Sequence, residues 1–131
     1  MSKVVRFVAA VAVGLLVWAV VATLGNFMLR AAIHDYHTQE IAVSFSLISQ
    51  IGRLALGVVS TTVAAAATVA IGRGGVGAPF ALGFVLLALF VPVHISLWQK
   101  FPVWYHLFFL ASLPLVSYVV GKSFVSRRSA A

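Results

Sequence analysis

The stretch Phe7–Leu29, which reads FVAAVAVGLLVWAVVATLGNFML, decides the fold class because about 23 consecutive positions hold no charged residue. A helix needs about 20 mostly apolar residues to cross the hydrocarbon core of a bilayer. Lys3 and Arg6 precede the stretch, just as basic residues precede the apolar part of a secretory signal peptide. That apolar part, however, is only about 7–15 residues long. We therefore predict a retained transmembrane helix over about residues 4–29.

The composition of the whole chain agrees with a membrane protein. Of its 131 residues, 63% are hydrophobic and only 8% are charged, whereas a soluble domain has about 25% charged residues. Cysteine is absent, which excludes disulfide scaffolds, thiol catalysis and cysteine-ligated metals. The net charge of +7 comes from scattered basic residues that form no patch interleaved with aromatic residues, so we expect no nucleic-acid partner.

Three more apolar stretches qualify as membrane spans. They predict helices over about residues 41–71, 79–98 and 103–121. Because the connections between them are short, consecutive helices should be antiparallel neighbours. The expected fold is all-α: an integral membrane four-helix bundle with up-down-up-down topology, forming a single transmembrane domain over residues 1–131 in the lipid bilayer.

The distribution of basic residues predicts the orientation. The side that holds both termini carries six basic residues, and the other side carries two, with Arg53 near its boundary. Because basic residues concentrate on the cytoplasmic side of membrane proteins, we expect both termini in the cytoplasm. The predicted localisation is a bacterial inner membrane, crossed several times. The six residues are Lys3, Arg6, Arg73, Lys122, Arg127 and Arg128.

Polar chemistry collects on the non-cytoplasmic side, where all four histidines and both acidic residues fall. His94 and His106 flank the short hairpin between the last two predicted helices, so we expect them at similar depth. Such a pair can ligate a b-type haem, with an arginine on a propionate, or hydrogen-bond a quinone headgroup. Alternatively, each histidine bonds a carbonyl or water at the interface. The predicted cofactor-binding residues are His94, His106, Arg53, Trp98 and Trp104.

A second cluster lies between the first two predicted helices. His34, Asp35, His37 and Glu40 have spacings that bring side chains onto one helix face, and divalent metals accept such nitrogen and oxygen ligands. The alternative is a set of solvated loop residues. Asp35 and Glu40 are also the only acids in the chain that could pair with Arg53, which otherwise extends toward lipid headgroups or binds an anion.

Small residues mark the first two predicted helices, among them Gly14, Gly25 and Gly57, and they favour close helix packing within the chain or between copies. The function this pattern favours is a non-enzymatic accessory, assembly or structural subunit, as a homo-oligomer or within a larger membrane complex. One alternative is a membrane module that binds a cofactor at the non-cytoplasmic boundary. Another is a small transporter or channel along a polar stripe that includes Gln50 and Arg53. An enzyme is the least favoured class, since no nucleophile arrangement stands out.

Overall fold

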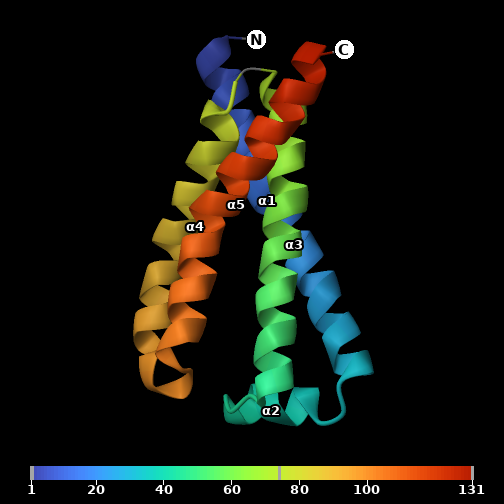
Figure 1. Ribbon diagram of the computed structural model, residues 1–131, viewed down its shortest axis with the longest axis vertical. Coiled ribbons are helices and arrows are strands. Elements are labelled where there is room, and N and C mark those ends of the chain that lie inside the picture. The colour runs from blue at the N-terminus through green and yellow to red at the C-terminus, as the bar shows by residue number, and fades with distance from the viewer. Residues whose placement is uncertain (1, 74, 131) are drawn as a thin grey trace.

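Four long helices form the protein, as expected from the sequence. The computed structural model describes residues 2–73 and 75–130, the last three by their backbone alone. The long helices are α1 (Lys3–Ala32), α3 (Leu47–Gly72), α4 (Gly77–Ser96) and α5 (Val103–Ala130) (Figure 1). Each is long and apolar enough to cross a membrane. The prediction of an all-α bundle of four long apolar helices is therefore confirmed, and all four are candidate membrane spans.

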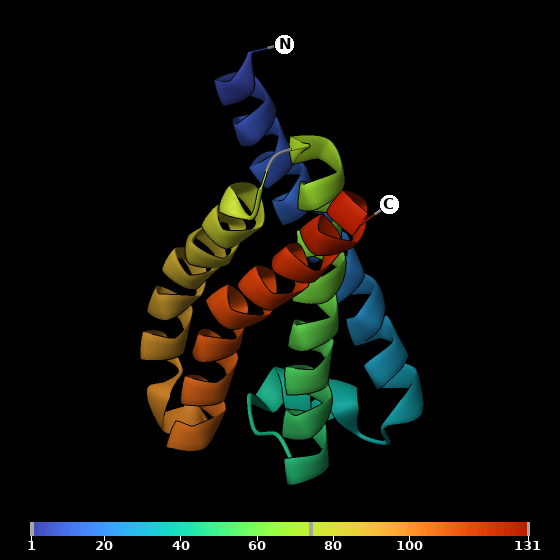
Figure 2. The same cartoon turned by 45° about the horizontal axis from the view of Figure 1, so that its top comes forward.

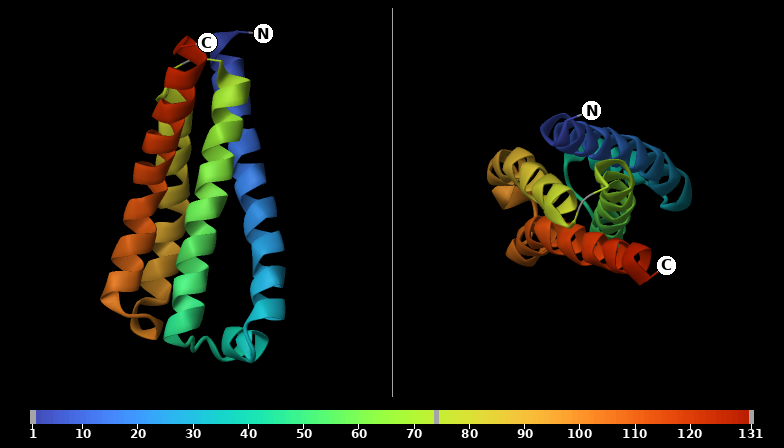
Figure 3. Two further views of the ribbon diagram at one scale, coloured as in Figure 1. Left: turned by 45° about the vertical axis from the view of Figure 1, so that its right-hand side comes forward. Right: turned by 90° about the horizontal axis from the view of Figure 1, so that it is seen from above.

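The helices run up and down beside one another, and both ends of the chain lie at the same end of the bundle (Figure 1). We call this the terminal end and the opposite one the hairpin end. Helix α3 packs against α1 and α5, and α5 packs against α4. Viewed from above, the four long helices are grouped around a common centre (Figure 3).

The terminal half is held together by small residues. Gly14 of α1 faces Thr68 and Leu82, and any added Cβ would overlap the Thr68 hydroxyl. A Cβ at Gly83 would lie 2.7 Å from the Cα of Pro114, closer than real side chains approach a backbone. Because lipid offers no hydrophobic force between helices, such close approach provides the attraction through van der Waals contact.

The hairpin half is more open. The helices lie close together near the termini and spread apart toward the hairpin end (Figures 1 and 3). Aromatic rings occupy this half. Trp18 lies 5.0 Å from Phe90, and Phe90 lies 5.2 Å from Phe109, measured between ring centroids. Large flat side chains thus separate the helices here and leave space between them.

The helix predicted over residues 41–71 is two helices in the structure. A short helix α2 (Tyr36–Ala42) lies across the hairpin end (Figure 2), and α3 begins only at Leu47. Val43 ends α2 in the left-handed region, at φ 50°. The hydroxyl of Ser46 then accepts a hydrogen bond from the backbone N–H of Ser49, which caps the start of α3. A capping serine thus starts a new helix where apolar spacing alone suggested continuity.

The two turns at the bundle ends complete the fold. At the terminal end α3 stops with Arg73 in the left-handed region, and α4 starts at Gly77. At the hairpin end a single 3₁₀ turn, η1 (Trp98–Lys100), joins α4 to α5. Helix α5 continues past the predicted end at residue 121, so the basic C-terminal segment extends the last membrane helix.

Candidate functional site

Arg53 is the centre of the polar site in the hairpin half. It lies on the second turn of α3 and is partly buried. Its Nε donates a hydrogen bond of 3.2 Å to the hydroxyl of Tyr105, and its Nη1 donates one of 3.0 Å to the hydroxyl of Tyr36. The guanidinium carbon lies 4.5 Å from the centre of the Phe45 ring. Aromatic side chains therefore hold this cation on three sides.

Among the described residues no carboxylate pairs with Arg53. The chain has two acids. Glu40 lies 2.6 Å from Arg30, and Asp35 lies 3.2 Å from His34. The possible pairing of Arg53 with Asp35 or Glu40 is therefore not formed, because both acids pair with basic residues of the first loop and its flanks. A charged arginine within a membrane span is costly and marks functional sites in membrane proteins.

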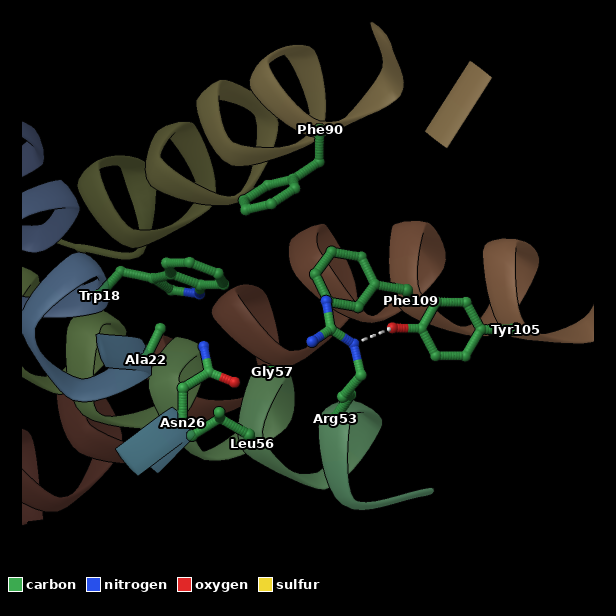
Figure 4. A pocket seen from close by; sticks show the side chains of 9 residues that line it. All are labelled: Trp18, Ala22, Asn26, Arg53, Leu56, Gly57, Phe90, Tyr105 and Phe109. Carbon is green, nitrogen blue, oxygen red and sulfur yellow. Dashed lines mark hydrogen bonds between the residues drawn. The ribbon is translucent and has the colours of Figure 1, made fainter. Parts of the chain in front are cut away.

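A cavity of about 190 Å³ lies beside Arg53. Figure 4 shows the guanidinium and the Tyr105 hydroxyl on one side of this space, with the Trp18 and Phe90 rings across it. Trp18 is fixed there because its Nε1 donates a hydrogen bond of 3.0 Å to Thr61. The lining combines three polar side chains and three aromatic rings, namely Asn26, Arg53, Tyr105, Trp18, Phe90 and Phe109.

The polar side of the cavity has hydrogen-bond donors to spare. The Tyr36 hydroxyl accepts from Arg53 and donates to the Asn26 amide oxygen at 3.1 Å. The Tyr105 hydroxyl also accepts from Arg53, but within the described ranges its own hydrogen meets no acceptor. Nη2 of Arg53 likewise donates no hydrogen bond to any described residue. The cavity is therefore suited to a ligand that carries acceptors.

His94 and His106 form a directly bonded pair behind the cavity wall. Their Nδ1 atoms lie 2.7 Å apart, and Nε2 of His106 lies 3.0 Å from the carbonyl oxygen of Trp98. A carbonyl only accepts, so Nε2 of His106 must carry its proton. In the neutral pair, Nδ1 of His106 then accepts from Nδ1–H of His94, which leaves the lone pair of His94 on Nε2. The His94 ring packs on Phe109, with the centroids 4.8 Å apart.

This arrangement does not fit axial ligation of a haem. A metal ion bound between two imidazoles lies roughly 2 Å from each nitrogen, so the nitrogens must be about 4 Å apart. Here they are 2.7 Å apart and share a proton. The cavity of about 190 Å³ is also small. A cavity of about 150 Å³ holds a benzene molecule, so this space admits one substituted ring rather than a macrocycle of four.

The structure brings together only part of the predicted cofactor set. Arg53 lines the cavity, and the His94–His106 pair lies one layer behind it. Trp98 stacks on His106 with the centroids 4.6 Å apart, whereas Trp104 neither lines the cavity nor stacks on the histidine pair; both tryptophans are 45% exposed.

The predicted metal cluster separates into pairs. His34 and Asp35 are exposed, and His37 lies 3.6 Å from Glu40. Among the described residues no group of three or more histidine or acidic side chains is placed to hold a metal ion. The metal hypothesis therefore gains no support from the geometry.

Most of the residues that line the cavity were not predicted from the sequence. Asn26, Trp18, Phe90 and Phe109 lie on three different helices and share no motif. The one available signal was Asn26, an amide near the end of an otherwise apolar span.

No family model matches the chain, and neither the curated proteins nor the solved structures contain a match to it. The fold defines a class, a small polytopic membrane protein with four candidate spans. Anything more specific depends on the geometry of the Arg53 site.

Proposed function

We propose that the protein is a non-enzymatic membrane module that binds the headgroup of a lipid-soluble quinone beside Arg53. The observation that carries this proposal is an arginine without a carboxylate partner, lining a cavity whose other walls are aromatic. Quinone carbonyls accept hydrogen bonds, and Nη2 of Arg53 and the Tyr105 hydroxyl are donors without an acceptor in the described chain. A flat ring also suits walls formed by Trp18, Phe90 and Phe109.

The size and position of the cavity favour a single-ring ligand supplied by the bilayer. Its volume of about 190 Å³ suits one substituted ring. The cavity lies between membrane-spanning helices, so the isoprenoid tail of a quinone would remain in lipid while the ring occupies the site. The role of the His94–His106 pair in this proposal is structural: it supports the ring of Phe109 from behind.

The proposed orientation places the terminal end in the cytoplasm of a bacterial cell. Six basic residues at that end, against two at the hairpin end, support this placement by the positive-inside rule. The quinone site then lies toward the non-cytoplasmic face of the inner membrane.

The accessory-subunit hypothesis has a weaker basis than the sequence suggested. It rests on small-residue faces, and these are used within the chain. Gly14 contacts Thr68, Gly25 contacts Leu56, and Gly57 contacts Phe109. Association into a homo-oligomer or a larger complex therefore stays a prediction without a specific surface.

The transporter alternative has a similar weakness. Of its polar stripe, Gln50 donates to the Phe45 carbonyl and Ser60 to the Leu56 carbonyl, so both side chains bond their own chain locally. Of the polar side chains in the stripe, only Arg53 lines the cavity, and its Nη2 bonds no described residue.

Binding of a short-tailed benzoquinone to the purified protein in mild detergent tests the proposal. Quinones quench tryptophan fluorescence, and Trp18 lies in the cavity wall. We expect saturable quenching by decylubiquinone and a loss of affinity of about 10- to 100-fold in Arg53→Gln, since a hydrogen bond from a charged donor is worth about 1.5–3 kcal/mol. Arg30→Gln, which removes an arginine outside the cavity, is the matched control. Equal affinity in the two variants would contradict the proposal.

A further inference from the structure

A second cavity, of about 460 Å³, lies at the terminal end and is unusually basic. It is lined by Lys3 and Arg6 of α1 and by Arg73, which ends α3. Within the described part of the chain none of these three cations has an ion pair or a side-chain hydrogen bond. Both acids of the protein, Asp35 and Glu40, lie at the opposite end. Three positive charges without a partner in the described chain therefore line one cavity. Such a cavity is suited to binding an anion.

An apolar groove of about 290 Å³ lies next to this basic cavity. It runs between α1 and α4, and every side chain that lines it is apolar. Phe7 lines both the cavity and the groove, so the two spaces adjoin. From Phe7 the groove follows α1 to Leu15, a span of about 12 Å along a helix at roughly 1.5 Å per residue. The groove thus descends from the charged rim into the membrane-spanning part of the bundle.

We propose that the basic cavity and the apolar groove together bind one anionic phospholipid. The phosphodiester lies among Lys3, Arg6 and Arg73, and an acyl chain lies in the groove between α1 and α4. Basic pockets between membrane helices are typical sites for anionic headgroups. A free phosphate would leave the groove unexplained, and a neutral lipid would leave the three cations unexplained. The quinone site lies in the other half of the bundle, so this proposal is independent of it.

Other basic residues at the same end provide an internal comparison. The Lys122 ammonium lies 5.9 Å from the centre of the Tyr118 ring, and the Arg127 guanidinium lies 5.7 Å from that of Phe124. Neither residue lines the basic cavity. If binding depended only on net charge near the membrane, these two cations would matter as much as Arg6 and Arg73.

Native mass spectrometry of the full chain in neutral detergent tests the proposal. We expect one molecule of phosphatidylglycerol to bind at least about tenfold more tightly than phosphatidylcholine with the same acyl chains. The double variant Arg6→Gln/Arg73→Gln should lose this preference, whereas Lys122→Gln/Arg127→Gln should keep it. An equal effect of the two double variants, or equal affinity for the two lipids, would overturn the proposal.

The groove needs its own test, because charge alone could attract a headgroup. Ala12 lines the groove and is exposed, so Ala12→Phe should fill it and weaken phosphatidylglycerol binding at least about fivefold. Ala19→Phe, at an exposed position of α1 outside the groove, should leave binding unchanged. The last experiment adds inorganic phosphate as a competitor of the bound lipid. If it displaces the lipid at equal concentration, or if Ala12→Phe binds lipid normally, the site is one for free phosphate and the proposal fails.

Discussion

The terminal half and the hairpin half of this bundle are built from the same helices but pack them differently. In the terminal half, glycines bring backbones together, as where Gly83 meets Pro114 and Gly121 meets Pro79. In the hairpin half, aromatic rings lie between the helices and line a cavity beside Arg53. The space beside Arg53 is therefore found where the rings separate the helices.

The comparison also concerns charge. In the hairpin half, Arg53 lies inside the bundle and bonds two tyrosine hydroxyls. In the terminal half, Arg6 and Arg73 line a hollow at the end of the bundle, and their side chains make no ion pair or hydrogen bond with any described residue. A cation that already bonds neutral hydroxyl groups suits a neutral acceptor such as a quinone carbonyl. Cations without a side-chain partner suit a charged phosphodiester.

The largest expected effect comes from overfilling the close-packed half. Gly83→Leu would push a side chain into the backbone of α5. Even an added Cβ would lie 2.7 Å from Pro114 Cα and 2.9 Å from the Leu113 carbonyl oxygen. Backbone atoms cannot move aside cheaply, so we expect a loss of about 3 kcal/mol in the free energy of unfolding. Unfolding in mixed micelles with increasing SDS measures it. Gly75→Ala is the control, because nothing lies within 4 Å of a Cβ there. Equal stability of the two variants would show that the contact between Gly83 and Pro114 is not closely packed.

The next effect concerns the paired histidines of the open half. Because His94 and His106 satisfy each other, His94→Leu or His106→Leu should each cost about 1–3 kcal/mol by leaving a buried ring nitrogen unpaired. The double variant should cost clearly less than the sum of the two, with a coupling of about 0.5–3 kcal/mol. The same SDS titration measures all four proteins. Strict additivity would show that the rings do not bond each other.

The smallest effect concerns the loop that closes the open half. The hydrogen bond from Arg30 holds the pKa of Glu40 below its ordinary value of 4.5. The folded state therefore binds this proton less readily than the unfolded state. The pair's contribution to stability is complete above about pH 4.5 and is lost as the pH falls through the lowered pKa of the folded state. Thermal unfolding between neutral and acidic pH should show a small decline that Glu40→Gln abolishes. A decline of the same size in Glu40→Gln would assign it to another group.

The membrane-spanning architecture could be read from the sequence because it depends on local composition. An apolar run such as Phe7–Leu29 has few alternatives to a helix in lipid, where backbone polar groups need internal partners. The matched depth of His94 and His106 followed from the short hairpin between them, and the structure brings them into contact.

The cavity could not be predicted in the same way, because its walls depend on the rotation of each helix about its own axis. In a helix that is apolar all round, such as α1, no polar face indicates which side turns inward. Trp18 and Asn26 therefore gave little sign of facing the same space as Arg53. The break between α2 and α3 was missed for a different reason. Ser46 caps the start of α3, and the spacing of apolar residues does not reveal a cap.

The spreading of the helices toward the hairpin end has a consequence for the surrounding bilayer. A bundle that is wider at one end displaces more lipid area from the leaflet at that end than from the opposite leaflet (Figures 1 and 3). The protein therefore has the shape of a wedge, and a flat membrane around it carries an imbalance in packing between its leaflets. Such an imbalance is smallest where the surrounding membrane curves toward the terminal end.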